Sequence, residues 1–397
     1  MVATVLVINS GSSSIKYQLV DPRIGHVLAS GLVERIGEDM GHIYHHFSVK
    51  EIDIHEPIPD HAAGLRMVLD LFEEVGPSLE DANIVAVGHR IVQGGQYFSG
   101  PATVDDRVLR LIDELSDLAP LHNPPGLVGI EVAQQLLPDI PQVVVFDTAF
   151  FQDLPPENAL YALDRDVAER YSIRRYGAHG TSHQYVSKRV SELLGRRDLK
   201  QIVLHLGNGA SASAIVGDHA IDTSMGLTPL EGLVMGTRTG DIDPAVVFHL
   251  QRVAGMTYEE VDTLLNRKSG LKGLVGDNDM RAVREIAMSG DHAARKRARE
   301  ALDIYVNRIV KYIGAYTAEM GGVDVISFTA GIGENDIELR REVCGRLESL
   351  GIILDQEANN QRPRQPITIS AKGSVARVMV VPTNEELAIA TQAMTVV

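Results

Sequence analysis

The sequence predicts an α/β fold built from two similar halves. A short apolar strand, a turn of glycine and serine, and a second strand occupy residues 5–20, V-L-V-I-N-S-G-S-S-S-I-K-Y-Q-L-V. The same arrangement returns at residues 201–216, Q-I-V-L-H-L-G-N-G-A-S-A-S-A-I-V, which indicates a duplication. Elsewhere, patterns typical of buried strands alternate with patterns typical of amphipathic helices.

The small-residue turn between the first two strands has two interpretations. Glycine and serine expose backbone N–H groups and hydroxyls in a concave set of donors that suits a phosphate. Lys16 adds a point charge beside them. An ordinary hairpin with a polar turn explains the same residues, and this stretch alone does not separate the two.

Length and composition restrict the function classes. A chain of 397 residues predicts two domains. The net charge of −16 argues against nucleic acid and anionic membranes as partners. Cys344 is the only cysteine, so no internal disulfide is possible and a reducing compartment fits. The first apolar run ends at Ile8, too early for a signal peptide or a membrane span, and we expect a cytoplasmic protein.

Further elements of the first half follow from periodicity and turn residues. Strands are predicted at residues 26–36, 43–49 and 84–87, and amphipathic helices at residues 62–75 and 105–118.

Histidines raise the question of a metal site in the second of these strands. His42, His45 and His46 lie close together, but a sound site needs further ligands in a defined geometry, and none is visible in the sequence. A solvated edge strand is the favoured interpretation. Residues 119–125, A-P-L-H-N-P-P, are predicted to form an extended loop, because two adjacent prolines oppose helix.

The middle of the chain places polar residues next to buried strands. Residues 142–146 are predicted to form an apolar strand, and Asp147 directly follows its C-terminal end. The C-terminal ends of strands are where α/β sheets bind ligands. Residues 176–183, Y-G-A-H-G-T-S-H, form a predicted turn with an H-x-x-x-H spacing. Zinc is not expected there, since the glutamate of the zinc motif is absent and Gly180 opposes helix.

Glycine-rich segments continue through the second half. The G-N-G turn is not a dinucleotide fingerprint, because a strand follows it, and no P-loop motif occurs. A capping box opens a helix at residues 257–266, and a long helix is expected at residues 291–320. A strand at residues 323–328 leads into a predicted glycine turn at residues 329–335, which would let a flat ring lie close to the backbone. A strand at residues 375–381 and a final capped helix complete the chain.

Nine motifs in order resemble the acetate kinase family, part of a superfamily with sugar kinases, actin and heat-shock ATPases. They are N-S-G-S-S-S-I-K, G-H-R-I-V-Q-G-G, L-H-N-P-P, F-D-T-A-F, Y-G-A-H-G-T-S-H, H-L-G-N-G, M-G-T-R-T-G-D-I-D, G-I-G-E-N and T-N-E-E. The resemblance implies two duplicated actin-like, ribonuclease-H-like α/β domains with a cleft between them. It places them at residues 1–147 plus 384–397 and at residues 148–383.

The resemblance also implies the reaction and the partners. The family transfers a phosphoryl group reversibly between ATP and acetate, giving ADP and acetyl phosphate, with Mg²⁺ or with Mn²⁺ in its place. It implies a homodimer whose interface lies in the second domain, and neither a nucleic-acid nor a membrane partner.

The family's site residues carry over onto matching positions. The catalytic residues implied are Arg90, Asp147, His179 and Arg238. Those implied for the carboxylate substrate are Arg90, Val92, Leu121, His122, Ala178 and Pro229. Those implied for the nucleotide are Ser12, Lys16, His205, Leu206, Gly207, Asn208, Gly209, Asp279, Met280, Arg281, Gly331, Ile332, Gly333, Glu334 and Asn335. Those implied for the metal are Asn9 and Glu385.

Elementary chemistry supports most of these roles. Phosphoryl transfer needs in-line positioning and stabilisation of charge on the moving group, which two arginine forks and an imidazole supply. The family's acid/base label for Asp147 fits less well, because a carboxylic acid with a pKa of about 4–5 is already ionised at neutral pH. We expect Asp147 to orient Arg238 or a water on magnesium.

One departure and two alternatives concern the substrate. Ala178 stands where the family usually has phenylalanine in the pocket for the substrate methyl group, so we expect a larger pocket that accepts propionate. The nearest alternative activity is therefore a propionate or butyrate kinase. An actin- or chaperone-like ATPase is the alternative from another class, although Arg90 and Arg238 suit an anionic acceptor better than water.

Overall fold

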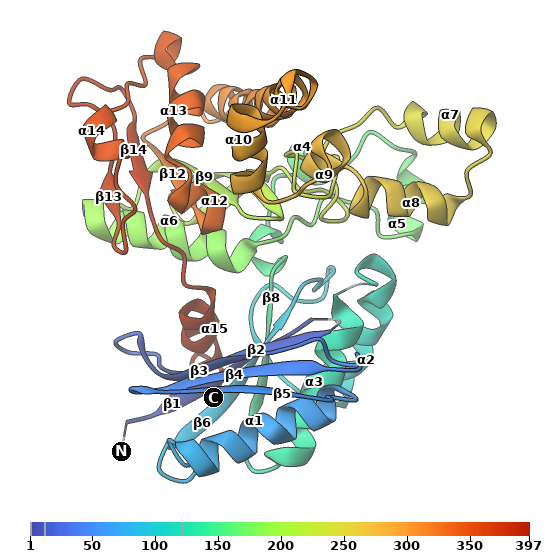
Figure 1. Ribbon diagram of the computed structural model, residues 1–397, viewed down its shortest axis with the longest axis vertical. Helices are drawn as coiled ribbons and strands as arrows, with labels where there is room; N and C mark the ends of the chain where they lie inside the picture. The colour runs from blue at the N-terminus through green and yellow to red at the C-terminus, as the bar shows by residue number, and fades with distance from the viewer. Residues whose placement is uncertain (1, 12, 121) are drawn as a thin grey trace. The chain divides into compact units, whose positions relative to one another are not determined.

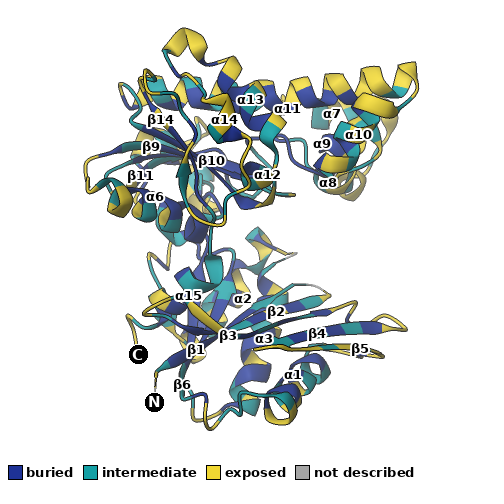
Figure 2. Cartoon of the chain, turned by 60° about the vertical axis from the view of Figure 1, so that its left-hand side comes forward, coloured by how far each residue is buried: buried dark blue, intermediate teal, exposed yellow. Residues whose placement is uncertain are grey.

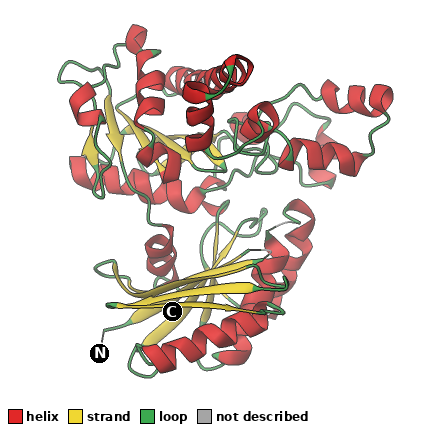
Figure 3. Ribbon diagram, in the orientation of Figure 1, coloured by secondary structure: helices red, strands yellow, loops and turns green. Residues whose placement is uncertain are grey.

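The computed structural model describes residues 2–11, 13–120 and 122–397, and the chain divides into two compact units. Unit 1 consists of Met1–Gln152 and Asn384–Val397, and unit 2 of Asp153–Thr383. Each unit contains a mixed β-sheet with helices packed on it (Figure 1, and by element type Figure 3). Within the described ranges, no helix combines the length and the apolar character needed to cross a bilayer.

The described part of unit 1 forms an eight-stranded sheet in the order β5-β4-β3-β2-β1-β6-β8-β7. Its strands are β1 (Thr4–Ser10), β2 (Ser14–Asp21), β3 (His26–Glu34), β4 (Gly41–Phe47), β5 (Lys50–Glu56), β6 (Ile84–Ile91), β7 (Ala102–Thr103) and β8 (Gln142–Phe146). Its α-helices are α1 (His61–Val75), α2 (Asp106–Glu114), α3 (Asn123–Leu136) and α15 (Glu385–Ala393).

Strand β1 is buried on both faces, which explains its unbroken apolar sequence. Leu6 and Ile8 belong to the same apolar cluster as Phe72 of α1 and Val132 of α3. The alternate residues Val5 and Val7 belong to a cluster with Ile389 and Ala393 of α15. The C-terminal helix therefore completes the core of the N-terminal unit.

The described part of unit 2 forms a six-stranded sheet in the order β11-β10-β9-β12-β14-β13. Its strands are β9 (Lys200–Leu206), β10 (Ala210–Val216), β11 (His219–Thr223), β12 (Val325–Thr329), β13 (Ile367–Thr368) and β14 (Arg377–Val380). Its α-helices are α4 (Pro156–Ala159), α5 (Arg165–Arg170), α6 (Gly180–Leu194), α7 (Ala245–Ala254), α8 (Tyr258–Arg267), α9 (Gly270–Val275), α10 (Met280–Ser289), α11 (His292–Glu319), α12 (Ala330–Asn335), α13 (Ile337–Gly345) and α14 (Gln356–Asn359).

The two sheets share one topology, as the repeated hairpin predicts. In unit 1, β3, β2 and β1 are antiparallel neighbours, and β6 and β8 then continue in parallel beside β1. In unit 2, β11, β10 and β9 are antiparallel, and β12 and β14 continue in parallel beside β9. A short antiparallel strand ends each sheet beside β8 or β14. The predicted α/β class and duplication are confirmed.

The prediction of an extended loop at the paired prolines is wrong. Helix α3 begins at Asn123, and Pro124 and Pro125 occupy its first turn. Proline is tolerated there because the first N–H groups of a helix have no intrahelical acceptor.

Two predicted turns are also helical. Gly180 is the first residue of α6, so it does not oppose that helix, and the predicted glycine turn at residues 329–335 is largely α12. Glycine costs helix stability mainly at interior positions, and Gly180 and Gly331 lie in the first turns of their helices.

The predicted edge position of the histidine-bearing strand is wrong as well. That strand is β4, and β5, which we did not predict, pairs outside it and forms the edge of the sheet. Strand β5 is largely exposed, as the yellow colour in Figure 2 shows, and its apolar alternation is limited to Ile52 and Ile54, which pack on the core. An alternation of two residues is too short to identify a strand in sequence.

Candidate active site

Two parallel strands of unit 1 bring an arginine and an aspartate together. Arg90 lies near the C-terminal end of β6, and Asp147 directly follows the neighbouring strand β8. The Nε atom of Arg90 lies 3.1 Å from both carboxylate oxygens of Asp147, and Nη2 lies 2.6 Å from Oδ2. Burial opposes the charge on Arg90, but Asp147 and Glu385 outweigh it and raise the arginine's pKa. The fork that holds Asp147 therefore belongs to Arg90, which our sequence reasoning did not foresee.

Buried polar residues brace the loop that follows Arg90. The amide of Asn123 accepts from the backbone N–H of Gln93 at 3.0 Å and donates to its carbonyl at 3.0 Å. Thr148, next to Asp147, accepts from the N–H of Gly94 at 2.9 Å. The loop after β6 and the start of α3 are thus held together at Asn123, which places Val92 and His122 on adjoining segments of unit 1.

Acidic residues at the start of α15 complete this group. Asn384 caps the helix, accepting from the N–H of Leu387 at 2.9 Å, so Glu385 and Glu386 form its first turn. Glu385 lies 3.9 Å from Arg90, and its pKa is raised by burial, which the arginine charge partly offsets.

The opening hairpin adds a lysine to the same unit. Glu386 forms an ion pair with Lys16 of β2, and Lys16 is the register partner of Asn9 in β1. Unit 1 therefore gathers predicted phosphate, metal and carboxylate residues around the ends of its central strands.

In unit 2, a histidine occupies the N-terminus of a helix. His179 caps α6 with a left-handed backbone, φ 59°. Its Nδ1 is hydrogen-bonded to the hydroxyl of Ser211 at 2.9 Å, and its ring stacks on that of His205 with centroids 4.2 Å apart. Ser211 also contacts the buried His183 at 2.7 Å, and burial lowers the pKa of His183 far below its usual value. A neutral imidazole and a hydroxyl thus fix the orientation of His179.

An arginine lies beside this histidine. A Cβ atom placed on Gly209 would lie 3.4 Å from the ring of His179 and 3.7 Å from Nη1 of Arg238, so the three residues meet at one point. Nη1 of Arg238 also donates to the carbonyl of Pro229 at 3.0 Å. Burial lowers the pKa of Arg238, an effect that an anionic ligand would offset.

In unit 2, the predicted nucleotide residues lie at the end of β9, on the turn after it, at the start of α10 and on α12. Residues 207–209 form the turn between β9 and β10. The Asn208 side chain accepts from Asn278 at 3.1 Å, which ties this turn to the start of α10. There Asp279 caps the helix, and hydrogen bonds from the exposed Arg281 lower the pKa of that carboxyl to about 2. Met280 is buried in the core.

Helix α12 carries the remaining nucleotide residues. It follows β12, whose last residue pairs with His205. Glu334 accepts from the N–H of Thr383 at 3.1 Å, and burial raises its pKa. The fully buried Arg340 donates to the carbonyls of Gly333 and Glu334 at 3.0 and 2.8 Å, which anchors the end of the helix. Gly331 has open space where a Cβ would stand, so its backbone is accessible.

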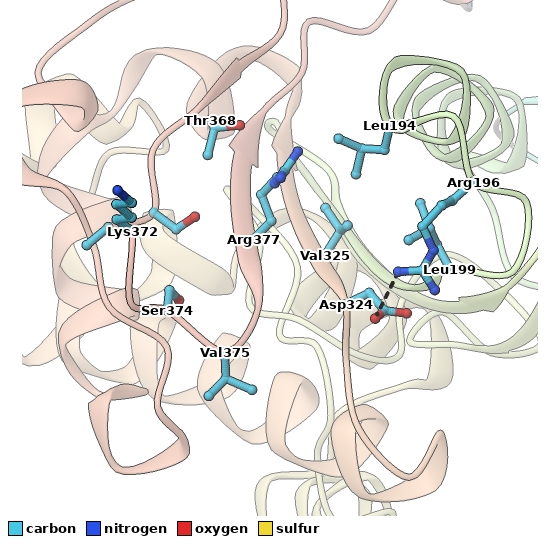
Figure 4. Close-up of a pocket in the computed structure, with 12 residues that line it drawn as sticks. Leu194, Arg196, Leu199, Asp324, Val325, Thr368, Lys372, Ser374, Val375 and Arg377 are labelled. Carbon is cyan, nitrogen blue, oxygen red and sulfur yellow. Dashed lines mark ion pairs between the residues drawn. The ribbon is translucent and has the colours of Figure 1, made fainter.

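Some predicted residues fall elsewhere. Ser12 and Leu121 lie outside the described residues, so their assignments stay predictions. Ala178 is 2% exposed and belongs to the apolar core of unit 2. A surface cavity of about 490 Å³ lies beside β12 and β14, where Arg196 pairs with Asp324 (Figure 4), but it is lined by none of the predicted residues. We assign it no ligand.

Comparisons with known proteins identify the family of the chain. Residues 4–391 match the model of the acetokinase family. The chain belongs to that family. It is 56% identical over 394 residues to an acetate kinase of Leifsonia xyli, covering 99% of this chain and 98% of the relative.

Solved structures of family members extend this likeness to the fold. A propionate kinase from Francisella tularensis matches with a TM-score of 0.94 at 39% identity and covers 100% of both chains. An acetate kinase from Porphyromonas gingivalis matches with a TM-score of 0.92 at 41% identity and covers 99% of both chains.

Several residues at these sites escaped sequence reasoning. Their shared role is to hold a neighbouring loop, helix or side chain by hydrogen bonds. They are Asn123, Thr148, His183, Ser211 and Arg340. The H-x-x-x-H spacing at residues 179–183 pointed to His183 in the sequence. The other four residues can be recognised only from the hydrogen bonds that they make in the folded chain.

Proposed function

We propose that this chain is a magnesium-dependent acetate kinase that transfers a phosphoryl group reversibly between ATP and acetate. Membership of the acetokinase family and 56% identity to an acetate kinase over nearly the full length support the activity. The structural observation that carries the proposal is a group of three side chains: Arg90 and Asp147 at the ends of two parallel strands, and Glu385 at the start of α15. The group offers a cation for a carboxylate beside oxygen ligands for a metal.

Each unit supplies part of what the reaction needs. Asp147 holds the Nε–Nη2 side of the Arg90 guanidinium, and the Nη1–Nη2 side has the geometry that suits the carboxylate of acetate. His179 and Arg238 converge beside Gly209 and suit the equatorial oxygens of the transferred phosphoryl group. Removing such a donor costs roughly 2.7–4 kcal/mol of transition-state stabilisation in other enzymes. The nucleotide would bind to residues 207–209, to residues 279–281 and to the exposed backbone at Gly331.

The donor chemistry of unit 1 fits magnesium. Asn9 and Glu385 offer the hard oxygen ligands that Mg²⁺ prefers, and Asp147 stands nearby as a further carboxylate. When bound, the ion would neutralise phosphate charge. The raised pKa of Glu385 is the shift expected where burial leaves a carboxylate short of positive charge.

We infer that Asp147 positions groups and does not transfer a proton. Its carboxylate holds the Arg90 fork, and acetate needs no deprotonation at neutral pH. The variant Asp147→Asn tests this: we expect weaker activation by Mg²⁺ and a higher KM for acetate. Intact magnesium dependence with a change confined to the acidic limb of the pH–rate profile would favour proton transfer instead.

Trapping acyl phosphate with hydroxylamine tests the activity itself. With ATP and Mg²⁺ we expect hydroxamate only when acetate is added. Release of phosphate from ATP that does not depend on acetate would support an ATPase. The same assay should be run with propionate and butyrate in place of acetate. Ala178 is smaller than the phenylalanine usual at this position, so the larger pocket that we expect should accept longer acids.

Unit 2 also carries the surface that we propose for a homodimer. Helix α7 has no buried residue, yet it is rich in apolar side chains. Phe248 and Val253 are 58% and 71% exposed, and Tyr258 at the start of α8 is 70% exposed. Exposed apolar side chains gathered on two neighbouring helices are what an interaction surface offers. Light scattering should find a dimer for the wild type and for the control Val49→Asp, and a monomer for Phe248→Asp; a dimeric Phe248→Asp would contradict the assignment.

A further inference from the structure

Strand pairing at the edge of unit 1 brings two histidines and two carboxylates onto one face. Strands β3, β4 and β5 are antiparallel, with Glu34 opposite His42 and His42 opposite His55. Asp53 lies two residues before His55 and therefore on the same face of β5. The alternate residues Val33 and Ile43 are fully buried in the core beneath α1, so the histidine face is the one turned away from that core.

The nitrogen and oxygen atoms of this group converge. Nε2 of His42 lies 2.9 Å from Oδ1 of Asp53, and Nε2 of His55 lies 3.0 Å from the same oxygen. The two imidazole rings stack almost in parallel, with centroids 4.6 Å apart and an angle of 11°. One donor atom from each of the three residues lies within 4.8 Å of the other two, and no other such group occurs among the described residues.

These separations suit a transition-metal ion. Zinc binds imidazole nitrogen at about 2.0–2.1 Å and carboxylate oxygen at about 2.0–2.2 Å, which places tetrahedral ligands roughly 3.3 Å apart. An imidazole holds a metal in the plane of its ring, so the two stacked rings must tilt out of their parallel arrangement to share one ion. The side chains of His55 and Asp53 are 63% and 60% exposed, which leaves them room to turn. Two imidazoles and a carboxylate favour zinc over magnesium, which prefers oxygen ligands.

A second, independent contact has the form expected around a metal-binding histidine. Oε2 of Glu34 lies 3.5 Å from Nδ1 of His42, on the opposite side of the ring from Asp53. Metal-binding histidines usually direct their other ring nitrogen to a carboxylate or carbonyl, which orients the ring. The Glu34 side chain is 48% exposed, and a small approach would let it accept a hydrogen bond from Nδ1–H of His42 and hold Nε2 towards the ion.

The neighbouring histidines of β4 do not share this environment. His45 is fully buried, and its Nδ1 is hydrogen-bonded to the hydroxyl of Tyr17 at 2.7 Å. His46 lies on the same face as His42 but pairs in register with Glu51. The converging residues therefore belong to two strands, and the spacing of histidines along β4 alone does not reveal them.

We propose that His42, Asp53 and His55 bind one Zn²⁺ ion, with Glu34 orienting His42 and a water completing the coordination. The ion would join β4 to β5, the outermost pair of the sheet. In the sheet, strands β3, β2 and β1 separate this pair from β6 and β8, at whose ends Arg90 and Asp147 lie. The proposal is independent of the kinase activity.

Zinc titration of the full-length protein tests the site. Calorimetry with ZnCl₂ is run in excess MgCl₂, which occupies oxygen-rich sites but competes poorly for imidazole. We expect one Zn²⁺ per chain for the wild type, and affinity at least tenfold lower for His42→Ala, Asp53→Asn and His55→Ala. The matched control His46→Ala removes an imidazole from the same strand and face and should bind as the wild type does.

Cobalt gives a second readout. Co²⁺ bound in place of Zn²⁺ should produce visible absorption bands of a tetrahedral site in the wild type and in His46→Ala, and lose them in His55→Ala. Kinase activity and circular dichroism show that each variant is folded. Equal Zn²⁺ affinity in the wild type and His55→Ala, or an equal loss in His46→Ala, would overturn the proposal.

Discussion

Removing the Arg90 side chain should destabilise unit 1 as well as abolish activity. Asp147 is 1% exposed, and the Arg90 fork contacts it at 3.1, 3.1 and 2.6 Å. Taking one partner from a buried ion pair typically costs about 3–5 kcal/mol, because the other charge stays buried without compensation. The side chain of Arg90 is itself 21% exposed, so water can partly reach the space that Arg90→Ala leaves. We therefore expect a loss near the lower end, about 3 kcal/mol.

Two further variants separate the stability effect from the chemistry. The double variant Arg90→Ala/Asp147→Asn also removes the buried charge that Arg90 faces and should regain more than half of the lost stability while staying inactive. Arg35→Ala is the matched control in the same unit. Its ion pair with Glu38 has both side chains more than half exposed and should contribute less than about 1 kcal/mol.

Hydrogen exchange followed by mass spectrometry measures these effects locally, since a chain of two units need not unfold in one step. Peptides that cover β6 and β8 should exchange faster in Arg90→Ala and recover in the double variant. Unchanged exchange in Arg90→Ala, or a double variant as fast as the single one, would refute the reasoning.

Three further predictions concern specificity, catalysis and pH. Ala178→Phe should raise the ratio of kcat/KM for acetate to kcat/KM for propionate, by a factor that corresponds to up to about 1–3 kcal/mol for the extra methylene. An unchanged ratio in a folded variant would contradict the predicted pocket. Ser211→Ala removes the hydroxyl that orients His179 and should lower kcat about fivefold at similar KM for acetate, as loss of roughly 1 kcal/mol would; a change in KM alone would count against it. Burial raises the pKa of Asp222 to about 7, so the folded chain binds this proton more tightly than the unfolded chain, and stability should fall as the pH rises from about 4 to 7. Urea denaturation across that range should show a flatter slope for Asp222→Asn, and an unchanged slope would contradict the assignment.

Local patterns in the sequence were sufficient for the elements that carry most of the site. Both hairpins, the buried strand before Asp147 and the capping box at Thr257 depend on neighbouring residues only, and the structure has each of them. The paired prolines misled us because the same residues fit an extended loop and the first turn of a helix. The side chain of Asn123, buried and bonded to Gln93, favours the helix, and that contact is 30 residues distant in sequence.

By itself, the sequence determined the α/β class, the duplication, the family and the identities of the candidate catalytic residues, because these depend on composition, periodicity and short motifs. Only the tertiary structure decided which of those residues meet. Arg90 and Asp147 are 57 positions apart and become partners because β6 and β8 are parallel neighbours. His42 and His55 face each other because of the register between β4 and β5. Strand order and register arise from packing of the whole sheet on its helices, and no local pattern contains that information.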